Sequence, residues 1–247
     1  MLKLMKYEFK KTMFSKLILL VITAIEEVLF LLGVFLEWEN GLILGSVALI
    51  LTAVFGVMYI GIESMAVLQK DLNTKQSYML FLPPKNSYQV LGAKVLENGI
   101  SILLSGLVYM GIAAIDIMVT VLYLGEVKEF LDLLKMMLRT FQVEITFTAG
   151  DAVVWGLLLL SSWLLTIIMA YLAIVLCATV FAGKKFSVFV SFLIFLVLSL
   201  ASSKLMDLIP SMETDTIYFF VMFLTVFIQA GICYFVTGWI MDKKLSV

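Results

Sequence analysis

The sequence predicts an all-α protein that crosses a membrane six times. Hydrophobic residues make up 63% of its 247 residues and charged residues only 14%, whereas soluble domains are about half apolar and about a quarter charged. Six stretches approach or exceed the roughly 20 apolar residues that a helix needs to cross the hydrocarbon core. The predicted spans are 17–36, 42–68, 95–124, 152–182, 186–203 and 216–241, and we treat 1–247 as one transmembrane domain.

Residues 1–16 predict an amphipathic helix on the cytoplasmic surface of the membrane, joined to the first span by an elbow. Apolar residues recur there at helical spacing, with lysines in a stripe beside them. They are Leu2, Met5, Phe9 and Met13, with Lys3, Lys6 and Lys10. The alternative is a basic leader that only sets the topology. Two glutamates inside the first span and no small-residue cleavage site predict that this span is not a removable signal.

The basic residues predict that both termini are cytoplasmic. With that orientation 13 of the 17 basic residues lie inside, as the positive-inside rule requires, and an even number of spans fits. The outer segments keep only Lys128, Lys135, Arg139 and Lys204. We expect a multi-pass protein of the bacterial plasma membrane that contacts lipids and binds no nucleic acid.

The outer segment 125–151 contains a second amphipathic pattern. Between residues 126 and 142, apolar side chains occupy one helical face and charged ones, including Lys128 and Asp132, the opposite face. A polar face is costly in lipid, so we expect an external lid or interfacial helix between spans three and four.

The cytoplasmic segment 69–94 carries an unusual number of polar residues. Asp71 or Asn73 is a suitable cap for a short helix, and Pro83 with Pro84 prevents its continuation. A helix then resumes and enters the third span. A short rigid helix at this position suits a partner that pushes on the membrane domain; the alternative is an ordinary hairpin with solvating lysines.

The stretch "MLFLPPKNSYQVLGAKVL" at residues 79–96, together with the order of the spans, resembles the permeases of type-2 ABC exporters. In that family an aspartate-containing helix, a Leu-Pro turn and a small-residue-lysine pair precede the third span. The resemblance implies a coupling helix that docks on an ATPase subunit, although Pro84 departs from the family pattern. The docking residues it implies are Lys70, Asp71, Leu72, Asn73, Lys75, Tyr78, Leu82, Pro83 and Lys85.

The chain has no phosphate-binding GxxxxGK[ST] loop. The resemblance therefore implies that ATP and Mg²⁺ are bound by a separate subunit, that this chain is not itself an enzyme, and that it binds no cofactor directly. It also implies a second permease chain, identical or homologous. The cargo would be an amphipathic peptide, lantibiotic-like or drug-like, as in antimicrobial resistance. Small residues suited to pairing the two chains occur in the second span, at Gly45, Ala53, Gly56 and Gly61.

Carboxylates inside the spans are candidates for the substrate pathway. Glu26 and Glu27 lie near the middle of the first span, where a charge costs about 2.5–3.5 kcal/mol. Glu63, Glu97 and Asp116 lie in the second and third spans; the alternative for Glu63 and Glu97 is that they only reach the cytoplasmic interface. One interpretation is that Glu26 or Glu27 lines a path for cationic, amphipathic cargo. The other is that both glutamates only pack between helices.

Other classes are less consistent with the sequence. There is no histidine, which removes the commonest metal ligand and the usual catalytic base, so we predict no catalytic residue and no metal site. Cys177 and Cys233 lie singly in apolar runs, as packing residues do. Two rivals to the exporter are a proton-coupled secondary transporter and a membrane scaffold or immunity protein without transport.

Overall fold

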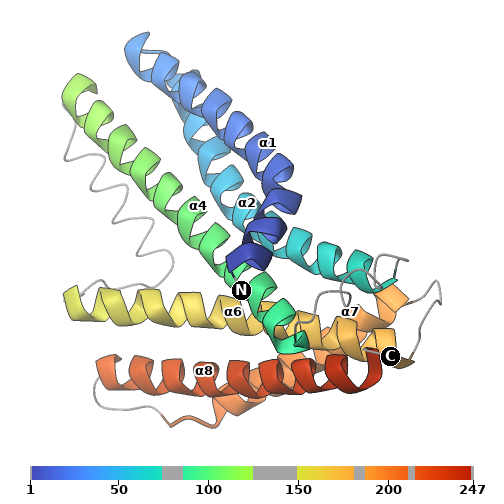
Figure 1. The fold of residues 1–247 in the computed structure, drawn as a ribbon. Helices are drawn as coiled ribbons and strands as arrows, with labels where there is room; N and C mark the ends of the chain where they lie inside the picture. The colour runs from blue at the N-terminus through green and yellow to red at the C-terminus, as the bar shows by residue number, and fades with distance from the viewer. Residues whose placement is uncertain (1, 74–85, 125–148, 181–186, 211–214, 246–247) are drawn as a thin grey trace. The chain divides into compact units, whose positions relative to one another are not determined.

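The computed structural model describes residues 2–73, 86–124, 149–180, 187–210 and 215–245, and these residues contain helices and no strand. The helices are α1 (Leu2–Phe35), α2 (Glu39–Asn73), α4 (Ser87–Leu124), α6 (Ala149–Val180), α7 (Ser187–Asp207) and α8 (Asp215–Ile240), with a π-helical turn, η1, at Met241–Leu245 (Figure 1). Six of them are long and apolar enough to cross a membrane. The predicted all-α, six-span membrane protein is confirmed at this level.

Two predicted helix boundaries are wrong. No elbow separates residues 1–16 from the first span, because α1 runs unbroken from Leu2 to Phe35 and contains no glycine before Gly33 and no proline. Asp71 does not begin a new helix, because it lies inside α2, which continues to Asn73. The helix that follows the two prolines does resume, at Ser87. Residues 74–85 and the outer helix predicted within 125–148 lie outside the described residues.

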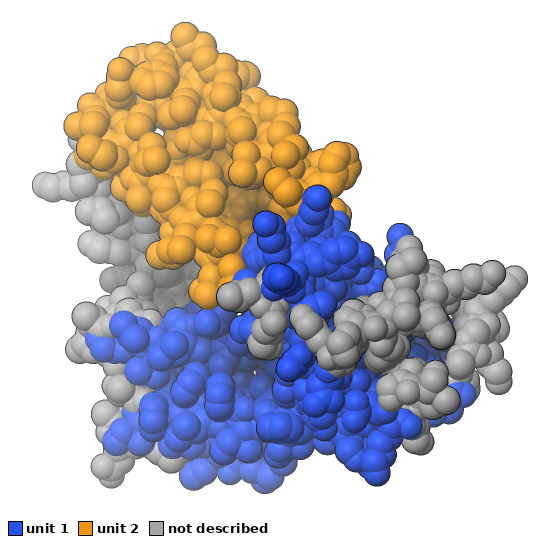
Figure 2. All heavy atoms as spheres, in the orientation of Figure 1, with its two compact units in different colours: residues 1–11, 61–99, 148–247 blue, residues 12–60, 100–147 orange. Residues whose placement is uncertain are grey.

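The chain forms two compact units (Figure 2). Unit 1 comprises Met1–Lys11, Gly61–Gly99 and Thr148–Val247, and unit 2 comprises Thr12–Ile60 and Ile100–Phe147. In unit 1, α6 lies beside α8 and also packs against α7. Leu68, Leu91, Ile167, Tyr171 and Val175 are fully buried in the core of this unit, and α6 is the most buried of the spans.

A tight turn joins α1 to α2 in unit 2. The backbone N–H of Trp38 donates to the Gly33 carbonyl at 2.9 Å, and that of Glu37 donates to the Val34 carbonyl at 3.4 Å. Glu37 has a φ of 51°, the left-handed conformation that ends many helices. The N–H of Leu42 then donates to the Trp38 carbonyl at 3.0 Å and starts α2. The turn therefore holds α1 and α2 as a helical hairpin.

Glycines allow the two helices of this hairpin to touch. A Cβ atom on Gly33 would lie 2.4 Å from the backbone nitrogen of Leu42, and one on Gly45 would lie 2.7 Å from the Cα of Phe30. Gly56 is enclosed in unit 2 and Gly61 in unit 1. Packing within this chain already covers Gly45, Gly56 and Gly61, so these three residues do not form the predicted surface for a second chain; Ala53, the fourth predicted residue, is half-buried.

Candidate functional site

Four charged side chains of unit 1 form a buried ion network. The Lys94 ammonium donates to Glu8 Oε2 at 2.9 Å and to Asp71 Oδ2 at 2.7 Å. The Lys11 ammonium donates to the same aspartate, at 2.6 Å to Oδ1 and 2.8 Å to Oδ2. The side chains of Lys94, Asp71 and Glu8 are only 2%, 5% and 6% exposed. Two positive and two negative groups balance, which offsets the desolvation of each one.

The network joins three helices that lie far apart in the sequence. Glu8 and Lys11 come from α1 and are one helical turn apart, Asp71 comes from the last turn of α2, and Lys94 comes from α4. Sequence reasoning missed this network. A signal does exist in α4, where Leu91, Lys94 and Asn98 are spaced by three and four residues and therefore share one helix face. Other apolar residues of α4 continue along the same helix face. A lysine on an apolar helix face is expected to point into the protein.

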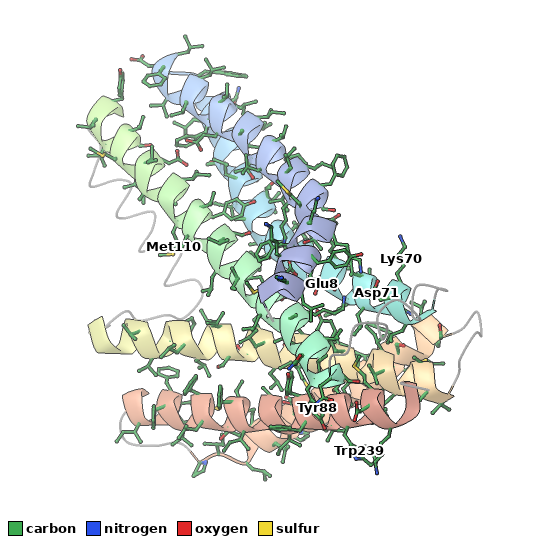
Figure 3. The ribbon with its side chains drawn as sticks, viewed as in Figure 1. Glu8, Lys70, Asp71, Tyr88, Met110 and Trp239 are labelled. Carbon is green, nitrogen blue, oxygen red and sulfur yellow. The ribbon has the colours of Figure 1, made fainter. Side chains whose placement is uncertain are left out.

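The start of α4 is fixed by a second set of contacts in unit 1. The Tyr234 hydroxyl of α8 donates to the Tyr88 carbonyl at 2.6 Å, and the Ser87 hydroxyl donates to Asp242 Oδ1 at 3.2 Å. A Cβ atom on Gly238 would lie 2.3 Å from the Tyr88 ring, so that ring lies directly on the α8 backbone (Figure 3). Residues on both sides of the segment 74–85 are thus anchored in unit 1.

The predicted ATPase-docking residues have different surroundings. Lys70 is exposed and points away from α2, whereas Asp71 is 3% exposed and turned inward (Figure 3). Leu72 packs against the core of unit 1, and Asn73 is the last residue of α2. In this arrangement Asp71 anchors the fold rather than offering a surface to a partner. Five of the predicted residues lie outside the described residues; they are Lys75, Tyr78, Leu82, Pro83 and Lys85.

In unit 2, Glu26 belongs to a polar group that spans α1, α2 and α4. The Thr52 hydroxyl donates to Glu26 Oε1 at 2.7 Å. The hydroxyls of Tyr109 and Thr23 share a hydrogen bond of 3.1 Å, and Tyr109 also reaches the Thr52 carbonyl at 3.5 Å. Glu26 Oε2 is buried and has no hydrogen-bond donor among the described residues. No sequence pattern distinguishes the partners of this group, Thr23, Thr52 and Tyr109, from other polar residues of the spans.

Glu27 and Asp116 are brought together from α1 and α4. Their carboxyl groups lie within hydrogen-bonding reach of each other, and each has a buried oxygen with no donor among the described residues. Of the four predicted pathway residues, Glu63 lies in unit 1, whereas Glu26, Glu27 and Asp116 lie in unit 2. The further candidate Glu97 is buried in unit 1, at 3% exposure.

An apolar pocket of about 590 Å³ lies beside this carboxyl pair in unit 2. Its walls come from α1, α2 and α4 and include Phe30, Leu49, Tyr109, Ile112 and Asp116. Phe30 and Leu49 belong to the buried core of the unit and Ile112 packs against them, so part of the pocket wall is also part of that core. Asp116 is the acidic residue in its wall.

The described residues contain no group of three His, Cys, Asp or Glu side chains placed to hold a metal ion. Both cysteines are free thiols, and the Cys177 thiol donates to the Ser187 carbonyl at 3.0 Å. In comparisons with known proteins, no protein-family model, curated protein or solved structure matches the chain.

Proposed function

We propose that this chain is the membrane-spanning permease subunit of an ATP-driven exporter, with ATP hydrolysed by a separate ATPase that docks on the segment between α2 and α4. The proposal places the termini in the bacterial cytoplasm and pairs the chain with a second permease chain. The six apolar helices give it a membrane domain of suitable size.

One observation carries the proposal: the Asp71–Lys94 ion pair, at 2.7 Å, joins the two helices from which the segment 74–85 departs. Lys11 and Glu8 extend the same network to α1. A load applied to the segment would therefore reach three helices at once. A docking segment on a loose base would lose that force in local bending, so a buried, neutral ion network is well suited to transmitting it.

The proposal is tested by co-purification with any ATPase chain that is encoded beside this one. The full chain is expressed with each such ATPase, solubilised in mild detergent and purified by a tag on this chain alone. We expect the native chain to retain an ATPase, and Tyr78→Ala or Lys75→Glu to release it. Lys204→Ala is the matched control, because Lys204 is exposed in α7 and belongs to a predicted outer segment.

Asp71→Asn needs a different readout, because this substitution acts inside the ion network. We expect it to lower the unfolding temperature of the chain, whether or not the ATPase is present. If the native chain retains no ATPase, or if the Tyr78 and Lys75 variants retain it as well as Lys204→Ala does, the exporter proposal is wrong.

A second candidate is a proton-coupled carrier, and the contact between Glu27 and Asp116 favours it. Two neighbouring carboxyl groups inside a membrane can take up and release a proton during a transport cycle. Reconstituted without any ATPase, such a carrier would acidify or alkalise vesicles when cargo is added, and Asp116→Asn would abolish this pH change. An exporter of the proposed kind shows no such change in the absence of its ATPase.

A further inference from the structure

The pocket of unit 2 has the size of a small-molecule site. Its volume of about 590 Å³ falls within the range of about 300–1,000 Å³ in which ligand pockets are found. Aliphatic and aromatic side chains form most of the wall, and the few polar groups are the hydroxyls of Ser46, Tyr109 and Thr120 and the carboxyl group of Asp116. A mainly apolar cavity with a few polar groups fixes the orientation of an amphipathic ligand.

A second carboxyl group lies beside the one in this wall. Asp116 and Glu27 are close enough to interact, and each has a buried oxygen with no hydrogen-bond donor among the described residues. When the two groups hold a single proton between them, the pair keeps one negative charge beside mainly apolar walls. A negative charge in apolar surroundings is stable only when a positive group pairs with it.

The described part of unit 2 supplies no such partner. Its only basic residue is Lys16, whose ammonium donates to the Ser101 hydroxyl at 2.5 Å. Lys16 precedes Glu27 by eleven residues in α1, a distance of about 16 Å along a helix. Glu26 adds a third buried carboxyl oxygen without a donor among the described residues of unit 2. Among the described residues of unit 2, no basic side chain is placed to pair with these carboxyl groups, and a cationic ligand would supply that charge.

We propose that this pocket binds a monovalent organic cation with bulky apolar groups, held by the charge shared between Asp116 and Glu27. A metal ion fits less well, because the described residues offer no cluster of three metal ligands. The rings of Phe30 and Tyr109 in the wall suit a cation that is weakly hydrated, through cation–π attraction. For the role of this ligand as cargo the inference rests on the proposed exporter function, but binding itself needs no ATPase.

Equilibrium dialysis of the full chain in lipid nanodiscs tests the proposal, with empty nanodiscs as the blank for partition into lipid. The probe is tetraphenylphosphonium, and tetraphenylborate is its control, because the two ions share size and shape but carry opposite charge. We expect saturable binding of one phosphonium per chain, at least tenfold tighter than that of the borate.

Variants then locate the site. We expect Asp116→Asn to weaken phosphonium binding about tenfold or more through loss of charge. Ala113→Phe should weaken it by filling the pocket, of which Ala113 forms part of the wall. Glu39→Gln is the matched control, because Glu39 is an exposed carboxylate of unit 2 that does not line the pocket, and we expect a change of less than twofold.

Several results would overturn the proposal. Equal binding of the two ions by the native chain would show that the pocket is only an apolar cavity, of the kind that a lipid acyl chain fills. This comparison uses the native chain alone, so it does not depend on the folding of any variant. Absence of saturable binding, or unchanged phosphonium binding by correctly folded Asp116→Asn, would do the same. If the cation binds as expected but no ATPase co-purifies, the pocket stands and the exporter proposal fails.

Discussion

The ammonium group of Lys94 lies 2.7 Å from Asp71 Oδ2, with the lysine side chain 2% and the aspartate side chain 5% exposed. The two residues are 23 positions apart, and the segment 74–85 lies between them in the sequence. This pair gives the segment a firm base, on which the proposed coupling depends.

We expect Lys94→Met to lower the free energy of unfolding by about 3–5 kcal/mol, because it removes the buried ammonium that contacts both Glu8 and Asp71 and leaves one lysine, Lys11, to balance two buried carboxylates of the network. Lys204→Met is the control, since the Lys204–Asp207 pair is 84% and 63% exposed and such pairs contribute about 0–1 kcal/mol. Denaturant unfolding in detergent gives both values. The double variant Glu8→Gln/Lys94→Met should recover part of the loss. Equal stability of the two single variants would show that the network contributes little.

Glycine positions in different surroundings should respond in opposite ways to alanine. Gly33→Ala and Gly45→Ala place a methyl group within 3 Å of backbone atoms of the facing helix, and we expect each to destabilise unit 2 or to push the hairpin apart. Gly106→Ala and Gly111→Ala meet open space, so they should raise stability by up to about 1 kcal/mol through helix propensity. Thermal unfolding of the four variants checks this order, and a Gly33→Ala chain as stable as Gly106→Ala would contradict the close approach of α1 and α2.

The turn between α1 and α2 offers a stabilising substitution. Glu37 has a φ of 51°, a conformation that costs an ordinary residue about 1 kcal/mol and costs glycine almost nothing. We expect Glu37→Gly to raise the unfolding temperature, whereas Glu39→Gly, in the first turn of α2, should lower it. A Glu37→Gly chain that is less stable than the native one would argue that the Glu37 side chain has a role in the turn.

The carboxyl groups of unit 2 should contribute unequally to transport. Glu26 already accepts a hydrogen bond from Thr52, while Glu27 and Asp116 share a pair beside the pocket. We therefore expect Glu27→Gln and Asp116→Asn to reduce export of a hydrophobic cation at least tenfold, and Glu26→Gln to reduce it less. ATP-driven uptake into inverted vesicles that contain the ATPase measures this. If all three variants export the cation as well as the native chain does, these carboxyl groups serve only in helix packing.

Sequence reasoning succeeded where one local property decides the outcome. Each span is recognisable because about 20 consecutive apolar residues are enough to make a helix stable in the bilayer. Each of the six predicted spans overlaps one of the six helices that are long and apolar enough to cross a membrane. The resumption of the helix after Pro84 was also predictable, because proline restricts the residues around it. The elbow after residue 16 was a wrong prediction, because amphipathic spacing says where a helix has polar faces but not where it bends.

The sequence by itself determined that this is a six-span, all-α membrane protein, and it pointed to Glu26, Glu27 and Asp116 as intramembrane carboxyl groups. Tertiary structure decided that Glu27 and Asp116 meet beside a pocket, and that Asp71 is an internal anchor bound by Lys11 and Lys94. The physical reason is distance along the chain. Hydropathy is a sum over neighbouring residues, whereas helix packing decides the partner of a charged group, which lies 86 positions away for Glu8 and Lys94.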